Sequence, residues 1–254
     1  MSFVLRCDRL QLQLRLNDNL DNDQISTLNQ ILVQRLDNYP LAYITNSKEF
    51  YGRLFQVSPA VLIPRPESEV MIEQALQIVN NNFIVQPSSA LKILDVGCGS
   101  GALGLTLASE LAQCGIDYQL TLADISRSAL DIARHNAQAL HITANFVISD
   151  LLKDIPQSSF NFILANLPYI DRQWSFIKNV DFEPDLALYA DNKGLALIFR
   201  LIDQIITMNN NSTHGWLLLE SDPIQQSAIS KYLIQHNFTN IKQVDYITVV
   251  DLKR

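Results

Sequence analysis

The sequence predicts an α/β fold in which a mostly parallel sheet of seven strands carries helices on both faces, preceded by a small helical region and a β-hairpin. Two observations predict this fold. From about residue 90, short apolar runs alternate with amphipathic helical stretches, which is the pattern of β-α-β units. The first run leads into a glycine-rich turn, Gly97 to Gly101, which opens a helical stretch as the ligand-binding turn of a Rossmann-like fold does.

The composition is ordinary for a globular protein and has an acidic balance. Of 254 residues, 48% are hydrophobic and 18% charged, and 26 Asp and Glu against 19 Lys and Arg leave a net charge of -7. Proteins that bind nucleic acid non-specifically are usually basic, so the charge weighs against a nucleic-acid partner. We recognise no secretory leader and no apolar run of about 18 residues. We therefore expect a cytoplasmic protein that does not span a membrane.

The side chains that commonly bind metals show no ligand spacing. The cysteines form no Cys-x-x-Cys pair and the histidines are scattered, at Cys7, Cys98, Cys114, His135, His141, His214 and His236. Structural zinc sites use closely spaced pairs of such residues. We therefore expect neither a metal nor a disulfide framework.

The first 66 residues divide into two segments. In residues 1–38, expected to be a small helical region, the leucines from Leu10 to Leu16 occupy alternate positions, which favours a strand by period alone. The apolar residues from Ile25 to Leu36 recur at helical spacing. Residues 39–66 hold four prolines, so we expect strand and turn rather than helix there, as a hairpin linker.

The remaining segment, residues 67–254, carries the alternating elements. It opens with an expected helix over residues 67–82. The expected strands cover residues 91–95, 118–123, 145–148, 160–165 and 216–220, with closing strands in 239–251. The expected helices cover residues 101–113, 126–140, 193–208 and 223–236, with Ser126 as the N-cap of the second.

An acidic residue precedes the glycine-rich turn. Asp95 ends the first expected strand, and the turn consists of Gly97, Cys98, Gly99, Ser100 and Gly101. Its G-x-G-x-G spacing differs from the G-x-G-x-x-G that places a pyrophosphate at a helix N-terminus. A methyl donor such as S-adenosylmethionine has no phosphate, and its amino-acid end carries an ammonium group that the Asp95 carboxylate suits. The combination favours a cofactor loop over a plain glycine-rich turn.

Carboxylates follow the next two expected strands. Asp124 can accept hydrogen bonds from both ribose hydroxyls of a nucleoside, which also suits NAD. Asp150 can accept one from an adenine amino group, while Leu151 packs on the ring. The alternatives are a helix cap for Asp124, a role that Ser126 already fills, and a surface loop for Asp150.

The segment Asn166-Leu-Pro-Tyr169 decides the class of reaction. It resembles the (Asn/Asp/Ser)-Pro-Pro-(Tyr/Phe) motif of methyltransferases that act on planar nitrogens, with Leu167 in place of the first proline. A planar nitrogen is a poor nucleophile, and two acceptors aimed at its N–H bonds orient it and stabilise the charge that develops. The Asn166 side chain and the Leu167 carbonyl can be these acceptors. Pro168 holds Leu167 extended, and Tyr169 can pack on the flat substrate group. We predict Asn166, Pro168 and Tyr169 as catalytic residues.

At this point the chain resembles the bacterial release factor glutamine methyltransferase family, over about residues 30 to 240. The segments that carry the resemblance, besides Asn166 to Tyr169, are Pro40 to Ile44, Phe50 to Phe55, the Ile-Pro-Arg-Pro-Glu segment within Leu62 to Glu69, Glu183 to Leu188, Gly194-Leu195 and Leu219-Glu220. The resemblance implies a Rossmann-like class I methyltransferase that uses S-adenosylmethionine. Its substrate would be the side-chain amide nitrogen of the glutamine in the Gly-Gly-Gln segment of class I peptide release factors.

The resemblance also implies site residues. Gly97 to Gly101, Asp124, Leu151 and Asn166 would line the cofactor site, and Asn166 to Tyr169 would hold the glutamine. Arg65 and Glu67 would shape the loop over the pocket, or else form a structural turn with an ion pair. The chain departs from the family in its short N-terminal region, in Leu167 and in the ending from Asp245 to Val250.

Two other functions stay open from the residues. The Asn-Leu-Pro-Tyr segment also occurs in rRNA adenine dimethyltransferases, so an adenine-N methyltransferase acting on rRNA or DNA is one. That activity would need an aromatic or basic surface for a flipped base, which we do not locate. A catalytically silent binding module is the other, against which the presence of Asp95, Asp124, Asn166 and Tyr169 counts.

Overall fold

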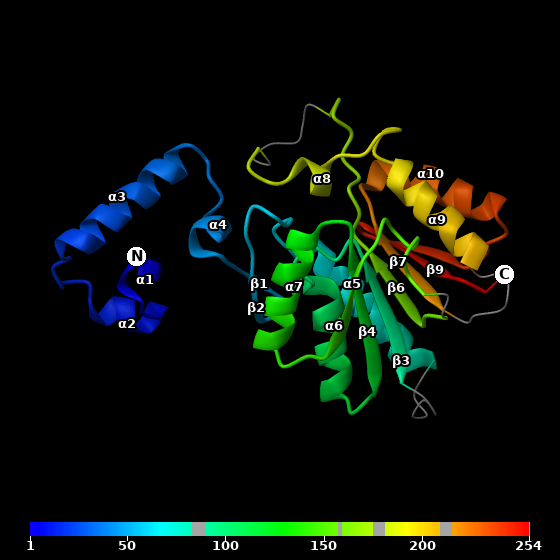
Figure 1. Cartoon of the computed structure of the whole chain (residues 1–254), viewed down its shortest axis with the longest axis horizontal. Helices are drawn as coiled ribbons and strands as arrows, with labels where there is room; N and C mark the ends of the chain where they lie inside the picture. The colour runs from blue at the N-terminus through cyan, green and yellow to red at the C-terminus, as the bar shows by residue number, and fades with distance from the viewer. Residues whose placement is uncertain (83–89, 157–158, 175–180, 209–214, 254) are drawn as a thin grey trace.

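A computed structural model gives the fold of the chain and describes all residues except 83–89, 157–158, 175–180, 209–214 and 254. Its main sheet has seven strands in the order β5-β4-β3-β6-β7-β9-β8 (Figure 1). Strands β3 to β7 run parallel, and β9 pairs antiparallel with both β7 and β8. The predicted fold class is therefore confirmed. The strands are β3 (Leu91–Val96), β4 (Tyr118–Asp124), β5 (Ala144–Ile148), β6 (Phe162–Ala165), β7 (Trp216–Glu220), β8 (Ile241–Val244) and β9 (Ile247–Asp251).

Helices cover both faces of this sheet because its strands are apolar on both sides. Ile93 of β3 packs into a core with α5 (Glu69–Asn82), α6 (Ala102–Gln113) and α7 (Arg127–Ala139). Leu94, the next residue, points to the opposite face and packs with α9 (Ala196–Met208) and α10 (Pro223–Gln235). Ser126 caps α7, as predicted, by accepting a hydrogen bond from the N–H of Ala129.

The order of the strands reverses at β3, which lies between β4 and β6. In an open parallel sheet, the loops that leave the carboxyl ends of two such strands diverge and leave a crevice where ligands bind. The expected glycine-rich turn follows β3 and the Asn166 segment follows β6. The topology therefore brings both to the same point.

The N-terminal region is helical, and the strand predicted over Leu10 to Leu16 is wrong. The helices are α1 (Ser2–Leu5), α2 (Arg9–Leu14) and α3 (Asn22–Leu36). Asp8 accepts a hydrogen bond from the Gln11 N–H, and the Gln11 side chain accepts one from the Asp8 N–H. This capping box starts α2, and leucine and glutamine are good helix formers, so local preference overrides the alternation.

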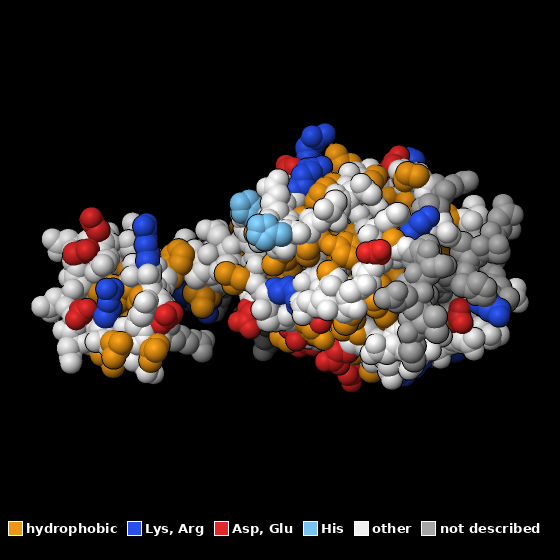
Figure 2. All heavy atoms as spheres, turned by 90° about the horizontal axis from the view of Figure 1, so that it is seen from below, with side chains coloured by type: hydrophobic (Ala, Val, Ile, Leu, Met, Phe, Trp, Pro, Cys, Tyr) orange, Lys and Arg blue, Asp and Glu red, His pale blue; other side chains and the backbone are white. Residues whose placement is uncertain are grey.

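These helices stand apart from the sheet (Figures 1 and 2). The space-filling view shows them as a separate lobe joined to the body by a narrow neck, with hydrophobic side chains at its surface. Leu14 and Leu36 are each 81% exposed. Among the described residues, no helix is long and apolar enough to cross a membrane.

The linker between this lobe and the sheet holds a helix that was not expected. Helix α4 (Leu41–Thr45) begins directly after Pro40, so the proline sits at its N-cap and does not interrupt it. Strands β1 (Ser47–Phe50) and β2 (Arg53–Gln56) then form the predicted antiparallel hairpin. A short 3-10 helix, η1 (Pro66–Ser68), leads into α5.

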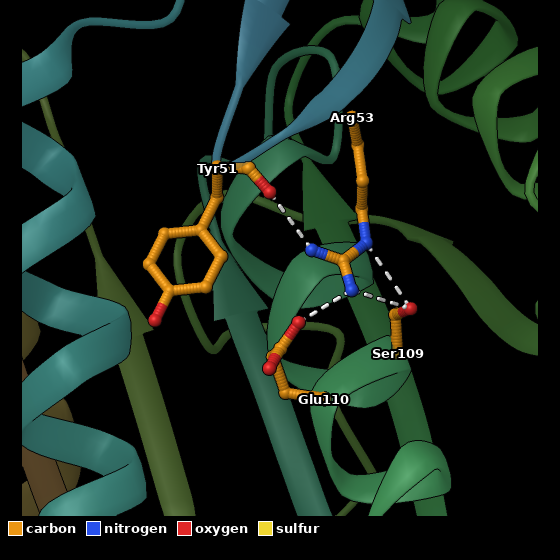
Figure 3. A network of polar contacts seen from close by, with 4 residues as sticks. All are labelled: Tyr51, Arg53, Ser109 and Glu110. Atoms are coloured by element: carbon orange, nitrogen blue, oxygen red, sulfur yellow. Dashed lines mark hydrogen bonds and ion pairs between the residues drawn. The ribbon is translucent and has the colours of Figure 1, made fainter.

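The hairpin is fastened to the sheet domain by polar contacts (Figure 3). The Arg53 guanidinium donates hydrogen bonds to Ser109 Oγ at 3.1 and 2.9 Å and to the Tyr51 carbonyl oxygen at 3.0 Å. It also pairs with Glu110 at 2.5 Å. Ser109 and Glu110 belong to α6, whose other end carries the glycine-rich turn, so the hairpin and the turn are held by one helix.

Candidate functional site

A cavity of about 500 Å³ lies at the carboxyl ends of β3, β4 and β6 and after β5. Most predicted site residues line it, namely Gly97, Cys98, Gly99, Ser100, Asp124, Asp150, Leu151, Asn166, Leu167 and Pro168. Asp95, Gly101 and Tyr169 lie behind this lining. Within the described part of the chain, no three His, Cys, Asp or Glu side chains gather as a metal site would require; His214 falls outside the described residues.

The glycine-rich turn approaches the Asn166 segment closely. Gly97 has a φ of +68°, and a Cβ atom there would lie 2.9 Å from the Leu167 side chain. A side chain at position 97 would therefore strain the backbone and displace the Leu167 side chain. The N–H groups of Gly97 and Cys98 both donate to the Ala123 carbonyl oxygen, at 2.8 and 3.0 Å, which fixes the turn against β4.

Asp124 ties the turn to the start of α7. One carboxylate oxygen accepts a hydrogen bond from the Gly99 N–H at 2.9 Å, and the other accepts one from the Ser126 N–H at 2.8 Å. Burial raises the pKa of this carboxyl group, and the backbone hydrogen bonds oppose that rise. Each oxygen keeps acceptor capacity beyond its one backbone donor, and the residue lines the cavity.

Asp95 is fully enclosed beneath the turn. Its Oδ2 accepts a hydrogen bond from the Gly104 N–H at 2.8 Å, in the first turn of α6. Its Oδ1 is buried and has no hydrogen-bond partner among the residues that the structure describes. Desolvation raises the pKa of Asp95 to about 7.

Asp150 and Leu151 form the rim on the β5 side. Asp150 is solvent-accessible and pairs with Arg200 of α9, which also lines the cavity. Leu151 is buried and has a φ of +55°, an unusual conformation for a side chain of this kind. The preceding Ser149 hydroxyl donates to the Leu151 carbonyl oxygen at 2.8 Å, which helps to hold the bend.

Asn166 follows β6 and is half-buried at the cavity wall. Its side-chain nitrogen Nδ2 donates a hydrogen bond to Ser68 Oγ at 3.1 Å. Ser68 ends η1, so this bond joins the segment Leu62 to Glu69 to the Asn166 segment. The amide nitrogen is thereby engaged on the protein side.

Tyr169 points away from the cavity lining. Its hydroxyl donates to Glu220 Oε1 at 3.3 Å, and burial, with the nearby Glu220 charge, raises the pKa of the phenol well above its usual range. Its carbonyl oxygen accepts a hydrogen bond from Gln225 Nε2 at 2.8 Å. Gly194, with a φ of +80°, lies so close that a Cβ atom would be 1.9 Å from this carbonyl oxygen, so only glycine fits there.

A contact between two segments far apart in the sequence covers one side of the cavity, which we call its roof. Glu183 is buried, accepts a hydrogen bond from the Ile63 N–H at 3.0 Å, and pairs with Arg65. Pro64 and Pro184, adjacent to these residues, both line the cavity. The ion pair expected of Arg65 is thus formed with Glu183, which lies 118 residues further along the sequence. The short helix α8 (Asp185–Leu188) continues this roof.

Comparison with known proteins decides the family. Residues 1–45 match the family described as PrmC N-terminal domain, and residues 68–180 match the Methyltransferase small domain. A release factor glutamine methyltransferase of Koribacter versatilis is 36% identical over 255 residues, which cover 96% of this chain and 84% of that protein. One of Escherichia coli is 34% identical over 226 residues, which cover 88% and 77%. The chain belongs to the release factor glutamine methyltransferase family.

Solved structures agree with the fold of a class I methyltransferase. A T. thermophilus 16S rRNA methyltransferase in complex with AdoMet and guanosine superposes with a TM-score of 0.58 at 16% identity, over 82% of this chain and 50% of that one. A methyltransferase from Pyrococcus furiosus gives a TM-score of 0.54 at 13% identity, over 89% and 99%. At these identities the likeness concerns the fold alone.

Several residues of this family member's site were not predicted from the sequence. Arg200 pairs with a predicted residue across 50 positions, and Ile125 lines the cavity directly after Asp124. Ser68 and Glu220 stood in segments that carry the family resemblance, but without a role. Their positions could have pointed to the site, since Ser68 lies within the Leu62 to Glu69 segment and Glu220 stands at the end of a buried strand.

Proposed function

We propose that this chain transfers a methyl group from S-adenosylmethionine to the side-chain amide nitrogen of the glutamine in the Gly-Gly-Gln segment of class I peptide release factors. Its relatives bear the name release factor glutamine methyltransferase. The observation that carries the proposal is the orientation of Asn166. Its amide nitrogen is bound to Ser68 within the protein, so its oxygen is left to accept a hydrogen bond from a substrate N–H at the cavity.

The residues present suit S-adenosylmethionine. The cavity size is within the range of small-molecule sites, and it is lined by apolar groups with a few polar ones. The unpartnered Oδ1 of Asp95, beneath the turn, is a buried acceptor that suits an ammonium group, and such a contact would lower the pKa that burial has raised. Gly97 to Gly101 would surround the amino-acid end, Asp124 the ribose, and Asp150 with Leu151 the adenine. When bound, this cofactor supplies an electrophilic methyl group.

The chain's own residues position the glutamine amide. Asn166 Oδ1 and the Leu167 carbonyl oxygen accept from its two N–H bonds, which orients the nitrogen lone pair toward the methyl donor. Pro168 holds Leu167 extended, and Leu167 itself is fixed by burial and by contact with Gly97. Tyr169, predicted to pack on the flat amide, lies behind the cavity lining, where its hydroxyl is bound to Glu220 and helps to hold the Asn166 segment. The nitrogen gains the methyl group and releases one N–H proton to water at the cavity, since that proton becomes acidic only as the new bond forms.

The proposed partner is a protein, and the proposed place of action is the cytoplasm, where release factors work. The acidic balance of the chain, with its net charge of -7, weighs against a nucleic-acid substrate. We also propose the division into residues 1–38, a hairpin linker at 39–66 and a methyltransferase domain at 67–254.

A methyl-transfer assay tests the proposal. Purified chain is incubated with labelled S-adenosylmethionine and a class I release factor that carries either Gly-Gly-Gln or Gly-Gly-Ala. We expect label on the wild-type release factor alone, and labelling slower by about 100-fold or more when the enzyme carries Asn166→Ala. Label on neither factor, with the cofactor still bound, would contradict the proposal and make rRNA and DNA the next substrates to try. Failure to bind the cofactor would instead indicate a silent binding module.

A further inference from the structure

The loop that follows β5 combines the proposed adenine contacts with an unfavourable backbone conformation. Asp150 and Leu151 both line the cavity, and Leu151 has a φ of +55°. A bulky residue keeps such a conformation only where its surroundings hold it there, and residues of this kind gather at ligand sites. The contacts that hold this loop therefore bear on how the adenine ring is bound.

Two side chains of α9 contact this loop on both sides of Leu151. The Arg200 guanidinium forms an ion pair with Asp150 Oδ1. Gln204 Oε1 accepts a hydrogen bond from the Leu152 N–H at 2.7 Å. Arg200 and Gln204 stand four positions apart in the sequence, so they lie on one face of the helix. One helix face thus fixes the Asp150 side chain and the backbone that follows Leu151.

Helix α9 is a firm support for these contacts. Leu197, one turn before Arg200, lines the cavity together with it. The adjoining face of the helix packs into the core of the sheet domain through four residues that are at most 1% exposed, namely Ile198, Leu201, Ile202 and Ile205. Because such a core is closely packed, the helix stays in place and the loop is held against a fixed element.

The ion pair leaves Asp150 an acceptor for the adenine. A carboxylate has two oxygens, and the pair with Arg200 is formed through Oδ1. Oδ2 can accept a hydrogen bond from the N6 amino group of adenine. Hypoxanthine carries a carbonyl group in place of this amino group, so it would set an oxygen against the carboxylate and offer it no donor. A carboxylate held in this place therefore distinguishes the two bases.

We propose that Arg200 and Gln204 are positioning residues that hold residues 150–152 against the adenine ring and so determine the preference of the site for adenine. The inference rests on the proposed function, in which S-adenosylmethionine is the cofactor and Asp150 contacts its base. Arg200 acts through the Asp150 side chain. Gln204 acts through the Leu152 backbone, and thereby on both Asp150 and Leu151.

The binding of two nucleoside thioethers to the full chain tests this role. S-adenosylhomocysteine and S-inosylhomocysteine differ in the base alone, and neither has a sulfonium charge, so the loss of the Arg200 charge affects both alike. Calorimetry gives the ratio of their Kd values, and we expect wild type to favour the adenosine compound at least about tenfold. Gln204→Leu and Arg200→Met should reduce this ratio about threefold or more. A general loosening of the fold would weaken both compounds equally and leave the ratio unchanged.

Two further variants serve as controls. Gln204→Glu keeps an acceptor for the Leu152 N–H. Arg134→Met removes an arginine from another exposed ion pair, with Asp131 on α7. We expect the ratio to stay within about twofold of wild type in both controls.

A double variant tests whether Arg200 acts through Asp150. Asp150→Ala should itself lower the ratio, and the addition of Arg200→Met should lower it no further, because the side chain that Arg200 positions is already gone. A further fall in the double variant overturns the proposal, as does a wild-type ratio in both Gln204→Leu and Arg200→Met.

The assay contains no release factor, so a reduced ratio in the two single variants supports the proposal even if the release factor proves not to be the substrate. Failure of wild type to bind either compound would contradict the proposed cofactor and overturn this inference with it.

Discussion

The main-chain N–H of Ile63 donates a 3.0 Å hydrogen bond to the Glu183 carboxylate, which joins two segments 120 residues apart over the cavity. Glu183 is 5% exposed and also pairs with Arg65. Because a buried carboxylate needs such partners, the two segments hold each other in place. The contact keeps Pro64 and Pro184 at the cavity wall without placing a charge inside it.

Replacing Glu183 should therefore weaken the roof of the site. Glu183→Ala leaves the Ile63 N–H without its acceptor and Arg65 without its counter-charge, and we expect a loss of about 1–3 kcal/mol in the free energy of unfolding. The KM for the release factor should rise with it. Asp185→Ala is the matched control, since the Arg172–Asp185 pair is exposed; its effect should stay within about 0.5 kcal/mol. Denaturant unfolding measures both, and equal effects would contradict the assigned role.

Removing the Asn166 amide should separate turnover from cofactor binding. Asn166→Ala loses the proposed acceptor for the substrate N–H, and the loss of one such aligned group typically costs about 100- to 1000-fold in kcat. Its side-chain nitrogen is bound to Ser68, and the residues proposed to hold the cofactor's amino-acid end, ribose and adenine stay in place, so the cofactor Kd should stay within about threefold of wild type. Single-turnover methyl transfer and calorimetry provide the two numbers. Intact turnover would show that Asn166 has no such role.

Asp124 should act on the cofactor instead. Asp124→Ala removes the acceptor of the Gly99 and Ser126 N–H groups as well as the proposed ribose contact, so we expect the cofactor Kd to rise at least about tenfold. Asp150→Ala, at the exposed rim, is the comparison and should raise it less. Calorimetric titration of each variant with S-adenosylmethionine decides between them. An unchanged Kd in Asp124→Ala would remove this residue from the proposed site.

Much of the sheet domain could be predicted because its elements carry their own periodic patterns. β7 was predicted with both ends correct, and the other predicted strands and helices of this domain lie within a few residues of their observed ends, whereas α8 was not predicted. The prediction of secondary structure was wrong where residues that start a helix outweighed the hydrophobic period or the presence of proline. The leucines from Leu10 to Leu16 alternate as in a strand, but the Asp8–Gln11 capping box makes a helix. Pro40 argues against a helix when only the density of prolines is counted, but at the N-cap of α4 it begins one.

The candidate site likewise contains residues that could be placed from the sequence and residues that could not. Residues directly after parallel strands, such as Asp124 and Asn166, could be placed together because the carboxyl ends of these strands meet at one edge. The Ser68–Asn166 hydrogen bond joins residues 98 apart, and the Tyr169–Glu220 bond joins residues 51 apart. The hydrophobic period and the local spacing of residues carry no information about contacts between such distant positions. Family resemblance marked their segments, but only the fold shows what Ser68 and Glu220 touch.

The buried Asp95 should make the stability of the unliganded protein depend on pH. Its pKa is about 7 in the folded chain because burial disfavours the charged form, against 3.8 for an unhindered carboxyl group. Between these values the folded state holds a proton that the unfolded state has released, so the contribution of Asp95 is fully present below about pH 4 and is lost as the pH rises through about 7. Asp95→Asn cannot titrate and lacks this loss.

We therefore expect the difference in melting temperature, Asp95→Asn minus wild type, to increase steadily from pH 4 to pH 7 and to level off above pH 7. Thermal unfolding across this range, with Ser100→Ala in the adjacent turn as a non-titrating control, measures the difference. The proposed ammonium contact adds a second expectation with the opposite sign: ionisation of Asp95 favours the cofactor, so wild-type affinity should rise through about pH 7 more steeply than that of Asp95→Asn. A constant melting difference would show that Asp95 is already charged in the folded chain.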